Sequence, residues 1–170
     1  MLKILNSLAP FFEDSAREIA VREYAKLAHV SPPTASKLLK KYARAGYLHQ
    51  RAERGHLLFT LNYEINDTVD LSRLYWKKRL EPLSITLQEK LSGASAILFG
   101  SLAKAEATPA SDADIAILTP EKKPIDLAPL EKALRRKISL HWFTSLRTIK
   151  NEHLLNNILN GTVLFGKVRW

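Results

Sequence analysis

The chain has 170 residues, 46% of them hydrophobic and 25% charged, which is typical of an ordinary globular protein with one domain or two small ones. The absence of cysteine excludes a disulfide framework and a thiolate zinc site. No run is apolar enough to span a membrane and no signal-peptide pattern is present, so we expect a cytoplasmic protein without a membrane partner. The net charge of +9 suits a polyanionic partner.

The chain begins with helical patterns separated by a short strand pattern. Hydrophobic residues near helical spacing predict a first helix over residues 1–14, in which Pro10 must kink or end the helix. Residues 17–21 predict a short strand, and residues 22–28 predict a second helix. The residues of this second helix that we expect to face the core are Tyr24, Leu27 and Ala28.

The third predicted helix has clear limits. Ser31 is in the N-cap position, Pro32 is at the first helical position, and Gly46 lies just past the end. Residues 48–51 and 56–61 then predict two strands joined by a tight turn. The sequence therefore predicts two helices joined by a short turn and followed by a hairpin.

This arrangement resembles a winged helix-turn-helix domain, and the resemblance covers roughly residues 1–65. It implies that residues 33–44 are a recognition helix for double-stranded DNA and that the hairpin is the wing. Six Lys or Arg residues lie against one acid between Ser31 and His56, an excess that favours phosphate contact. The alternative is that these residues form only a solvated helix face. The predicted DNA-binding residues are Thr34, Ser36, Lys37, Lys40, Lys41, Arg44, Arg51 and Arg54.

Residues 66–92 predict a helical linker of two helices, interrupted near Pro82. The adjacent Tyr75 and Trp76 favour packing between domains or in a dimer over a platform for base stacking. A homodimer would suit a winged helix because dimers read paired half-sites.

A buried strand that runs into a glycine turn is predicted at Ala96–Phe99. Gly100 follows it, and a residue without a side chain lets backbone amides approach an anion closely. A second buried strand is predicted over residues 115–118, preceded by Asp112 and Asp114. Side chains two positions apart in an extended chain point to the same face, so this acid pair can hold one hard cation. Such a pair alone is more often two exposed acids at a strand edge, but the preceding strand and glycine turn favour a site.

The stretch LFGSLAKAEATPASDADIAIL resembles the signature of the minimal nucleotidyltransferases of the DNA polymerase beta superfamily. The resemblance implies a domain that binds Mg2+ and ATP or another nucleoside triphosphate. It places Asp112 and Asp114 as catalytic and metal-binding residues, and Ala105 stands where the family usually has glycine. The residues that it places at the nucleotide are Gly100, Ser101, Lys104 and Ser111.

The third acid of active family members is missing. They carry it on the strand after the next helix, but the predicted strand over residues 138–143 has no acid, and Ser139 and His141 stand there instead. The third acid normally helps to hold the ion that activates the attacking hydroxyl, so nucleotide binding would survive better than catalysis. His141 could act as a base only within reach of the acceptor, and a core or surface histidine is the alternative. Asp126, the nearest later acid, is interpreted as a helix N-cap.

The sequence therefore predicts an α+β protein with a winged helix-turn-helix domain over residues 1–65, a helical linker over 66–92, and a nucleotidyltransferase-fold mixed sheet with helices over 93–170. The final pattern Asn-Gly-Thr-Val-Leu-Phe-Gly resembles the close of archaeal fusions of these two domains. The function that we expect is that of a DNA-binding transcriptional regulator whose second domain binds Mg-nucleotide. The alternatives are an active nucleotidyltransferase with a hydroxyl acceptor, and an antitoxin-like partner of a helical toxin.

Overall fold

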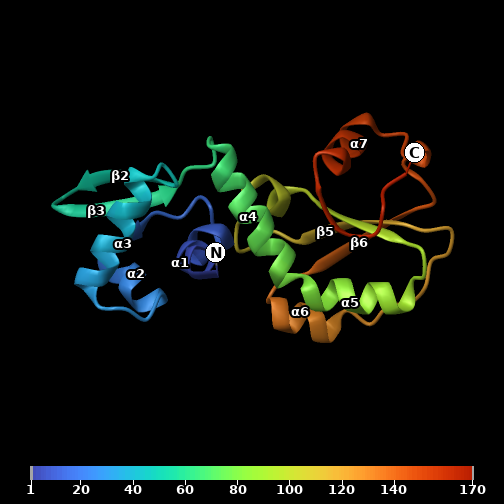
Figure 1. Ribbon diagram of the computed structural model, residues 1–170, viewed down its shortest axis with the longest axis horizontal. Helices are drawn as coiled ribbons and strands as arrows, with labels where there is room; N and C mark the ends of the chain where they lie inside the picture. The colour runs from blue at the N-terminus through green and yellow to red at the C-terminus, as the bar shows by residue number, and fades with distance from the viewer. Residues whose placement is uncertain (1, 170) are drawn as a thin grey trace. The chain divides into compact units, whose positions relative to one another are not determined.

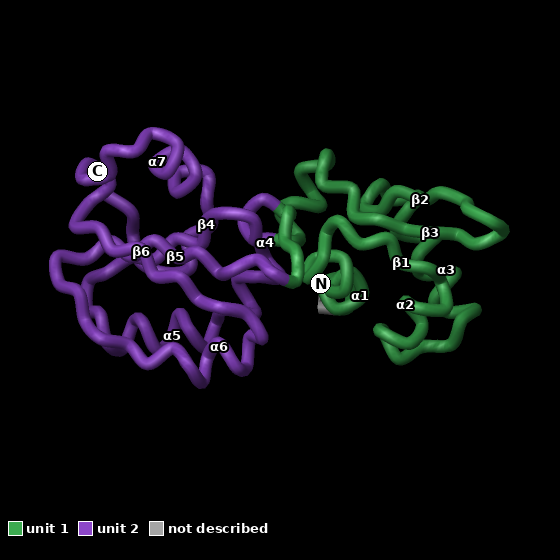
Figure 2. The backbone as a smooth tube through the Cα atoms, turned by 180° about the vertical axis from the view of Figure 1, so that it is seen from behind, with its two compact units in different colours: residues 1–72, 105–109 green, residues 73–104, 110–170 purple. Residues whose placement is uncertain are grey.

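The computed structural model describes residues 2–169 and divides the chain into two compact units. Unit 1 consists of Met1–Ser72 and Ala105–Pro109, and unit 2 consists of Arg73–Lys104 and Ala110–Trp170 (Figure 2). Helix α4 (Asn66–Arg79) contains the boundary between them. No helix among the described residues has the length and apolar character needed to cross a membrane.

The helices of unit 1 are α1 (Leu2–Glu13), α2 (Val21–Leu27) and α3 (Pro32–Arg44) (Figure 1). Pro10 lies inside α1 and does not end it. The next two residues, Phe11 and Phe12, are almost completely buried, so their packing outweighs the hydrogen bond that proline removes. Leu27 was expected to face the core, but it is 43% exposed. It is the last residue of α2, and the chain turns away at His29, which has a positive φ.

The limits of α3 follow the predicted capping signals. The Ser31 hydroxyl accepts a hydrogen bond from the Thr34 amide at 3.3 Å, and Pro32 occupies the first helical position. Gly46, with φ +85°, follows the helix end at Arg44. Ala35, Leu39 and Tyr42 are the buried face of this helix.

The sheet of unit 1 has three antiparallel strands in the order β1-β3-β2. They are β1 (Ile19–Ala20), β2 (Leu48–Glu53) and β3 (His56–Leu61). Arg54 and Gly55 form the two-residue turn between β2 and β3, and both have positive φ, as a tight hairpin turn of this kind requires. The predicted strand over residues 17–21 is reduced to two residues in β1.

Unit 2 is built on a mixed sheet with the strand order β6-β5-β4-β7. Strand β4 pairs antiparallel with β5 and with β7, whereas β5 and β6 run parallel. These strands are β4 (Ser95–Phe99), β5 (Ala113–Leu118), β6 (Ile138–Phe143) and β7 (Thr162–Phe165). In addition to the second half of α4, unit 2 contains the helices α5 (Glu81–Lys90), α6 (Ala128–Leu134) and α7 (Glu152–Leu159).

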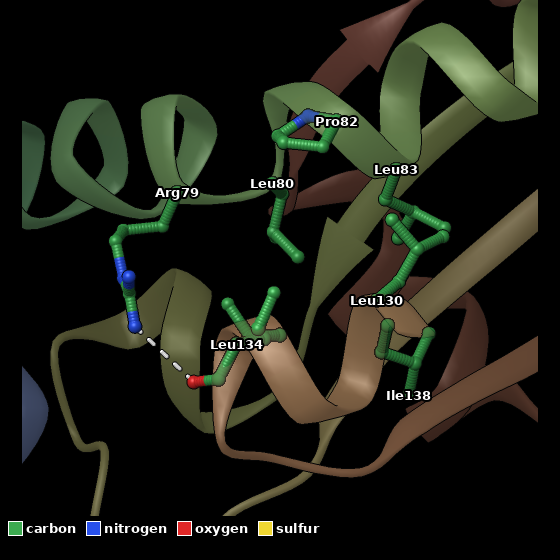
Figure 3. A pocket seen from close by; sticks show the side chains of 8 residues that line it. Arg79, Leu80, Pro82, Leu83, Leu130, Leu134 and Ile138 are labelled. Atoms are coloured by element: carbon green, nitrogen blue, oxygen red, sulfur yellow. Dashed lines mark hydrogen bonds between the residues drawn. The ribbon is translucent and has the colours of Figure 1, made fainter. Parts of the chain in front are cut away.

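Helices cover both faces of this sheet, with α7 on one side and α5 and α6 on the other (Figures 1 and 2). On the α7 side, Ile97 and Ala116 belong to a buried cluster with Ile158 of that helix. Burial on both faces explains why β4 is buried along its whole length and apolar from Ala96 to Phe99. A small pocket of about 120 Å³ between α4, α5 and α6 is lined mainly by apolar residues, and no candidate site residue borders it (Figure 3).

Polar side chains lie at the starts of the last two helices. Asp126, interpreted from the sequence as a helix N-cap, lies one position before the N-cap Leu127 of α6, and its carboxylate accepts a hydrogen bond from the Ala128 amide at 3.1 Å. The Asn151 side chain caps α7 by accepting a hydrogen bond from the Leu154 amide at 3.0 Å. A 3-10 turn, η2 (Leu146–Thr148), precedes it.

Candidate functional site

The glycine turn after β4 lies directly against Asp114. Gly100 has φ +74°, and a Cβ atom added to it would lie 2.8 Å from Asp114 Oδ2. Glycine suits this position for its conformation, and a larger residue would require the Asp114 carboxylate to shift. The chain continues as the 3-10 turn η1 (Ser101–Lys104), in which Ser101 is half-buried and Lys104 exposed.

The two acids and the two residues that replace the third acid lie on one face of the sheet. In the parallel pairing of β5 and β6, Asp114 is opposite Ser139. The Ser139 hydroxyl donates to Asp112 Oδ2 at 3.4 Å, and His141 Nε2 lies 3.2 Å from Asp114 Oδ1. All four residues are partly exposed. The structure thus brings both predicted carboxylates together with Ser139 and His141, and each carboxylate has one of these residues as a hydrogen-bonding neighbour.

His141 is held on two sides. Its ring packs edge-on against Phe99, with the centroids 5.1 Å apart, and its Nε2 atom faces Asp114. Its side chain is 39% exposed, so it is not a core histidine. It lies at the surface of the candidate site, with Nε2 beside the Asp114 carboxylate.

The donor set fits one hard cation better than two. Carboxylate oxygens are the ligands that Mg2+ prefers, and Asp112 and Asp114 supply them. Among residues 2–169, no group of three His, Asp or Glu side chains is placed to hold a metal ion by itself. The remaining ligands of a Mg2+ ion would have to come from nucleotide phosphates and water, as they often do for this ion.

Two arginines at this site carry no distinctive sequence signal. Arg136 is only 8% exposed, and its Nη1 atom donates to the Ser111 carbonyl at 2.9 Å. Arg73 on α4 donates through Nε to the Ala103 carbonyl in η1 at 2.9 Å. In the sequence, Arg136 lies between two basic residues that are exposed, so its burial follows only from the fold.

Ala105 is the position at which the chain departs from the resembled signature. It has φ +60°, a conformation that favours glycine, at the position where the family usually has glycine. Ala105 thus adopts a left-handed backbone conformation in which glycine would be less strained.

The predicted DNA-binding residues of α3 lie mostly on its exposed side. Thr34, Lys37, Lys40, Lys41 and Arg44 are exposed, whereas Ser36 is half-buried. The Thr34 hydroxyl lies 2.8 Å from the Ser31 hydroxyl, so it takes part in the cap of the helix. The structure thus leaves a row of cations on the face opposite the buried residues.

The two predicted wing residues differ. Arg51 on β2 forms a two-pronged ion pair with Glu18 and a further one with Glu53 at 2.9 Å. The hydrogen bond from Arg51 lowers the pKa of Glu18. Contact between Arg51 and a phosphate would have to compete with these ion pairs. Arg54 lies exposed in the hairpin turn.

Comparison with known proteins agrees with the geometry of unit 2. Residues 82–165 match the family model of the nucleotidyltransferase domain, and the match includes the glycine turn, both acids, Ser139 and His141. Searches of curated proteins and of solved structures found no match. The matched part of the chain, with its mixed sheet, is thus similar to a nucleotidyltransferase domain.

Proposed function

We propose that the protein is a DNA-binding transcriptional regulator whose nucleotidyltransferase-like domain binds a magnesium-nucleotide complex. The observation that carries the nucleotide half of this proposal is the Asp114 carboxylate packed against Gly100. A glycine turn beside a pair of acids that suit a hard cation is the arrangement that a metal-bound phosphate group needs.

The residues divide the work of nucleotide binding. The backbone at Gly100 and the hydroxyl of Ser101 approach the phosphates, and exposed Lys104 adds a positive charge beside them. Asp112 and Asp114 would hold Mg2+, which neutralises the charge of phosphate oxygens when it is bound. Ser111 precedes this acid pair, and its carbonyl is held by Arg136.

The replacement of the third acid favours binding over transfer. Nucleotidyl transfer requires an acceptor hydroxyl to attack the α-phosphorus while pyrophosphate leaves and a base takes the proton. Ser139 cannot serve as that base at neutral pH, and it instead donates a hydrogen bond to Asp112. We therefore expect a nucleotide that is held without efficient transfer.

The DNA half of the proposal is supported by α3 and the hairpin that follows it. Four exposed cations, Lys37, Lys40, Lys41 and Arg44, lie on one helix whose other face is buried. Such a row suits the phosphate backbone of duplex DNA. A helix flanked by a hairpin is the arrangement of a winged helix, in which the helix enters the major groove.

Calorimetric titration of ATP and the other triphosphates, with and without Mg2+, tests the nucleotide half. We expect Mg2+-dependent binding to the wild type that is lost in the Asp112→Asn, Asp114→Asn double variant. Asp126→Asn is the control, because Asp126 lies outside the site and an amide oxygen can still accept the Ala128 hydrogen bond. Binding of no triphosphate by the wild type would overturn the nucleotide half of the proposal.

One observation favours a second candidate, an active nucleotidyltransferase. His141 Nε2 lies 3.2 Å from Asp114 Oδ1, so an imidazole, a group that can serve as a general base, stands beside the predicted metal-binding acid. This candidate predicts transfer of labelled nucleotide to a protein, nucleic acid or small-molecule hydroxyl. The transfer would be abolished by Asp112→Asn and strongly reduced by His141→Ala. Pyrophosphate release with neither dependence would exclude this site as its source.

A further inference from the structure

Two arginines of unit 2 bind the main chain on the two sides of the candidate site. Arg73 donates through Nε to the Ala103 carbonyl at 2.9 Å and through Nη2 to the Asn160 carbonyl at 3.1 Å. Arg136 donates through Nη1 to the Ser111 carbonyl at 2.9 Å. Ala103 lies in the turn that begins with Ser101, and Ser111 directly precedes Asp112. Each half of the site therefore has its own arginine.

The burial of Arg136 makes it unlike an ordinary surface arginine. Its residue is 8% exposed, and its guanidinium lies 4.9 Å from the centre of the Trp76 ring. Removing a guanidinium from water is costly unless hydrogen bonds and an aromatic face compensate. Arg136 is buried in spite of this cost, and its hydrogen bond fixes the Ser111 carbonyl. This indicates that the position of the segment before Asp112 matters.

Both arginines are organised by helix α4. Arg73 lies on α4, and Trp76, which stacks with Arg136, lies three residues further along the same helix. Residues three apart on a helix share a face. One helix face is therefore linked to the turn after Gly100 through Arg73, and to the segment before Asp112 through Trp76 and Arg136.

The two halves of the site lie close together at Gly100 and Asp114. The site of an added Cβ on Gly100 is only 2.8 Å from Asp114 Oδ2, so the turn and the carboxylate are already in close contact. A shift of about 1 Å in either half would close the space beside the turn or separate the carboxylates from bound phosphates.

We propose that Arg73 and Arg136 are positioning residues that hold the Ser101–Lys104 turn and the Ser111–Asp114 segment at the separation that a magnesium-nucleotide complex needs. This inference rests on the proposed nucleotide site. The two residues act through the Ala103 and Ser111 carbonyls, and neither is assigned a contact with nucleotide.

The test uses the full chain with Arg73→Met and Arg136→Met, and with Arg136→Lys as the conservative variant. Lys77→Met is the matched control, because Lys77 also lies on α4 and donates to a main-chain carbonyl, that of Val163, at 2.9 Å. Residue-resolved amide hydrogen exchange is measured first, without ligand. The most informative amide is that of Ala113, which donates to the Lys137 carbonyl at 2.8 Å.

We expect exchange at Ala113 to rise about tenfold or more in Arg136→Met, with little change in the β4 amides, and to return partly toward the wild-type rate in Arg136→Lys. In Arg73→Met the increase should be confined to residues 101–104. In ATP titrations with Mg2+, both methionine variants should bind about tenfold or more weakly, whereas Lys77→Met should bind as the wild type does.

The outcomes separate the two proposals. Unchanged exchange near both residues overturns the positioning role, whether or not the wild type binds nucleotide. If the variants alter exchange but the wild type binds no triphosphate, the nucleotide is excluded as the ligand, and only the positioning of the two segments is supported. Exchange in the β4 amides that rises as much as exchange near the two arginines would show a general loss of stability and overturn specific positioning. If Arg136→Met does not fold, exchange at Ala113 in Arg136→Lys is compared directly with the wild type: a higher rate supports the positioning role of Arg136, and an equal rate overturns it.

Discussion

The basic face of α3 and the carboxylate site of unit 2 are assembled in opposite ways. Lys37, Lys40 and Lys41 are neighbours on one helix and all exposed, so each acts nearly independently of the others. Asp114, Gly100 and His141 come from separate segments and meet at short distances. We therefore expect substitutions on α3 to have graded, additive effects, and substitutions in the site to have large effects that depend on their neighbours.

The largest effect is expected for Gly100→Ala, which adds a methyl group where the turn and the Asp114 carboxylate are in close contact. The new Cβ would displace the Asp114 carboxylate, and alanine would be strained at φ +74°. We expect the free energy of unfolding to fall by about 2 kcal/mol or more and Mg-nucleotide affinity to fall at least about tenfold. The measurements are denaturant unfolding and calorimetry.

Gly55→Ala is the matched control for that variant. Gly55 has a similar φ of +79°, but an added Cβ would meet no atom within 4 Å. It should therefore lose only about 1 kcal/mol, the strain alone, with nucleotide binding unchanged. Equal losses in the two variants would mean that the contact between Gly100 and Asp114 has no importance.

The next effect is expected on DNA binding when Lys37, Lys40 and Lys41 are all replaced by alanine. Each lost phosphate contact should lower the slope of log affinity against log salt by about 0.9, so the triple variant should lower it by about 2 to 3. The single variants should add up to the triple one. Fluorescence anisotropy with labelled duplex DNA at several salt concentrations measures this, and Asp112→Asn should have no effect. A salt slope equal to the wild type would exclude α3 as the contact surface.

A smaller effect is expected for Ser139→Asp, which places a third carboxylate beside Asp112. Ser139 now donates to Asp112 at 3.4 Å, so the variant replaces a hydrogen bond with like-charge repulsion. The unfolding midpoint should fall by roughly 2–4 °C without metal and recover in Mg2+. Ser139→Asn, which adds no charge, should show no recovery. The same midpoints for both variants in Mg2+ would argue against a cation site here.

The smallest effect concerns the exposed pair of Glu18 and Arg51 in unit 1. The hydrogen bond from Arg51 lowers the pKa of Glu18 in the folded protein, so the pair stabilises the fold above the unfolded pKa of this carboxyl. That contribution is lost as the pH falls through the lower folded pKa. The difference in unfolding midpoint between the wild type and Glu18→Gln should therefore be small at neutral pH and vanish in acid. A difference that grows on acidification would contradict this assignment.

Local signals in the sequence predicted local structure well. The N-cap Ser31, the two-residue turn at Gly55 and the apolar run at Ala96–Phe99 each specify their element through a few neighbouring residues. The acid pair and the glycine turn were predicted for the same reason, as parts of one contiguous signature. The ends of helices were less predictable. Packing keeps α1 helical through Pro10, and the Asn151 cap sets the start of α7.

The supports of the site could not be predicted from the sequence. Arg136 contacts Ser111, 25 residues earlier, and the bond from Arg73 to Ala103 spans 30 residues. Neither arginine differs in its local pattern from the exposed basic residues around it. The contact of His141 with Asp114 depends on the parallel pairing of β5 and β6, which no residue pattern specifies by itself.

The most direct test of the account is a crystal structure of the full chain grown with Mg2+ and a non-hydrolysable ATP analogue. The account predicts one ion bound by Asp112 and Asp114 and by phosphate oxygens, with the triphosphate against the backbone of Gly100 and Ser101. Saturating analogue that leaves the Asp112 and Asp114 carboxylates still bonded to Ser139 and His141, with the triphosphate bound elsewhere or absent, would contradict it.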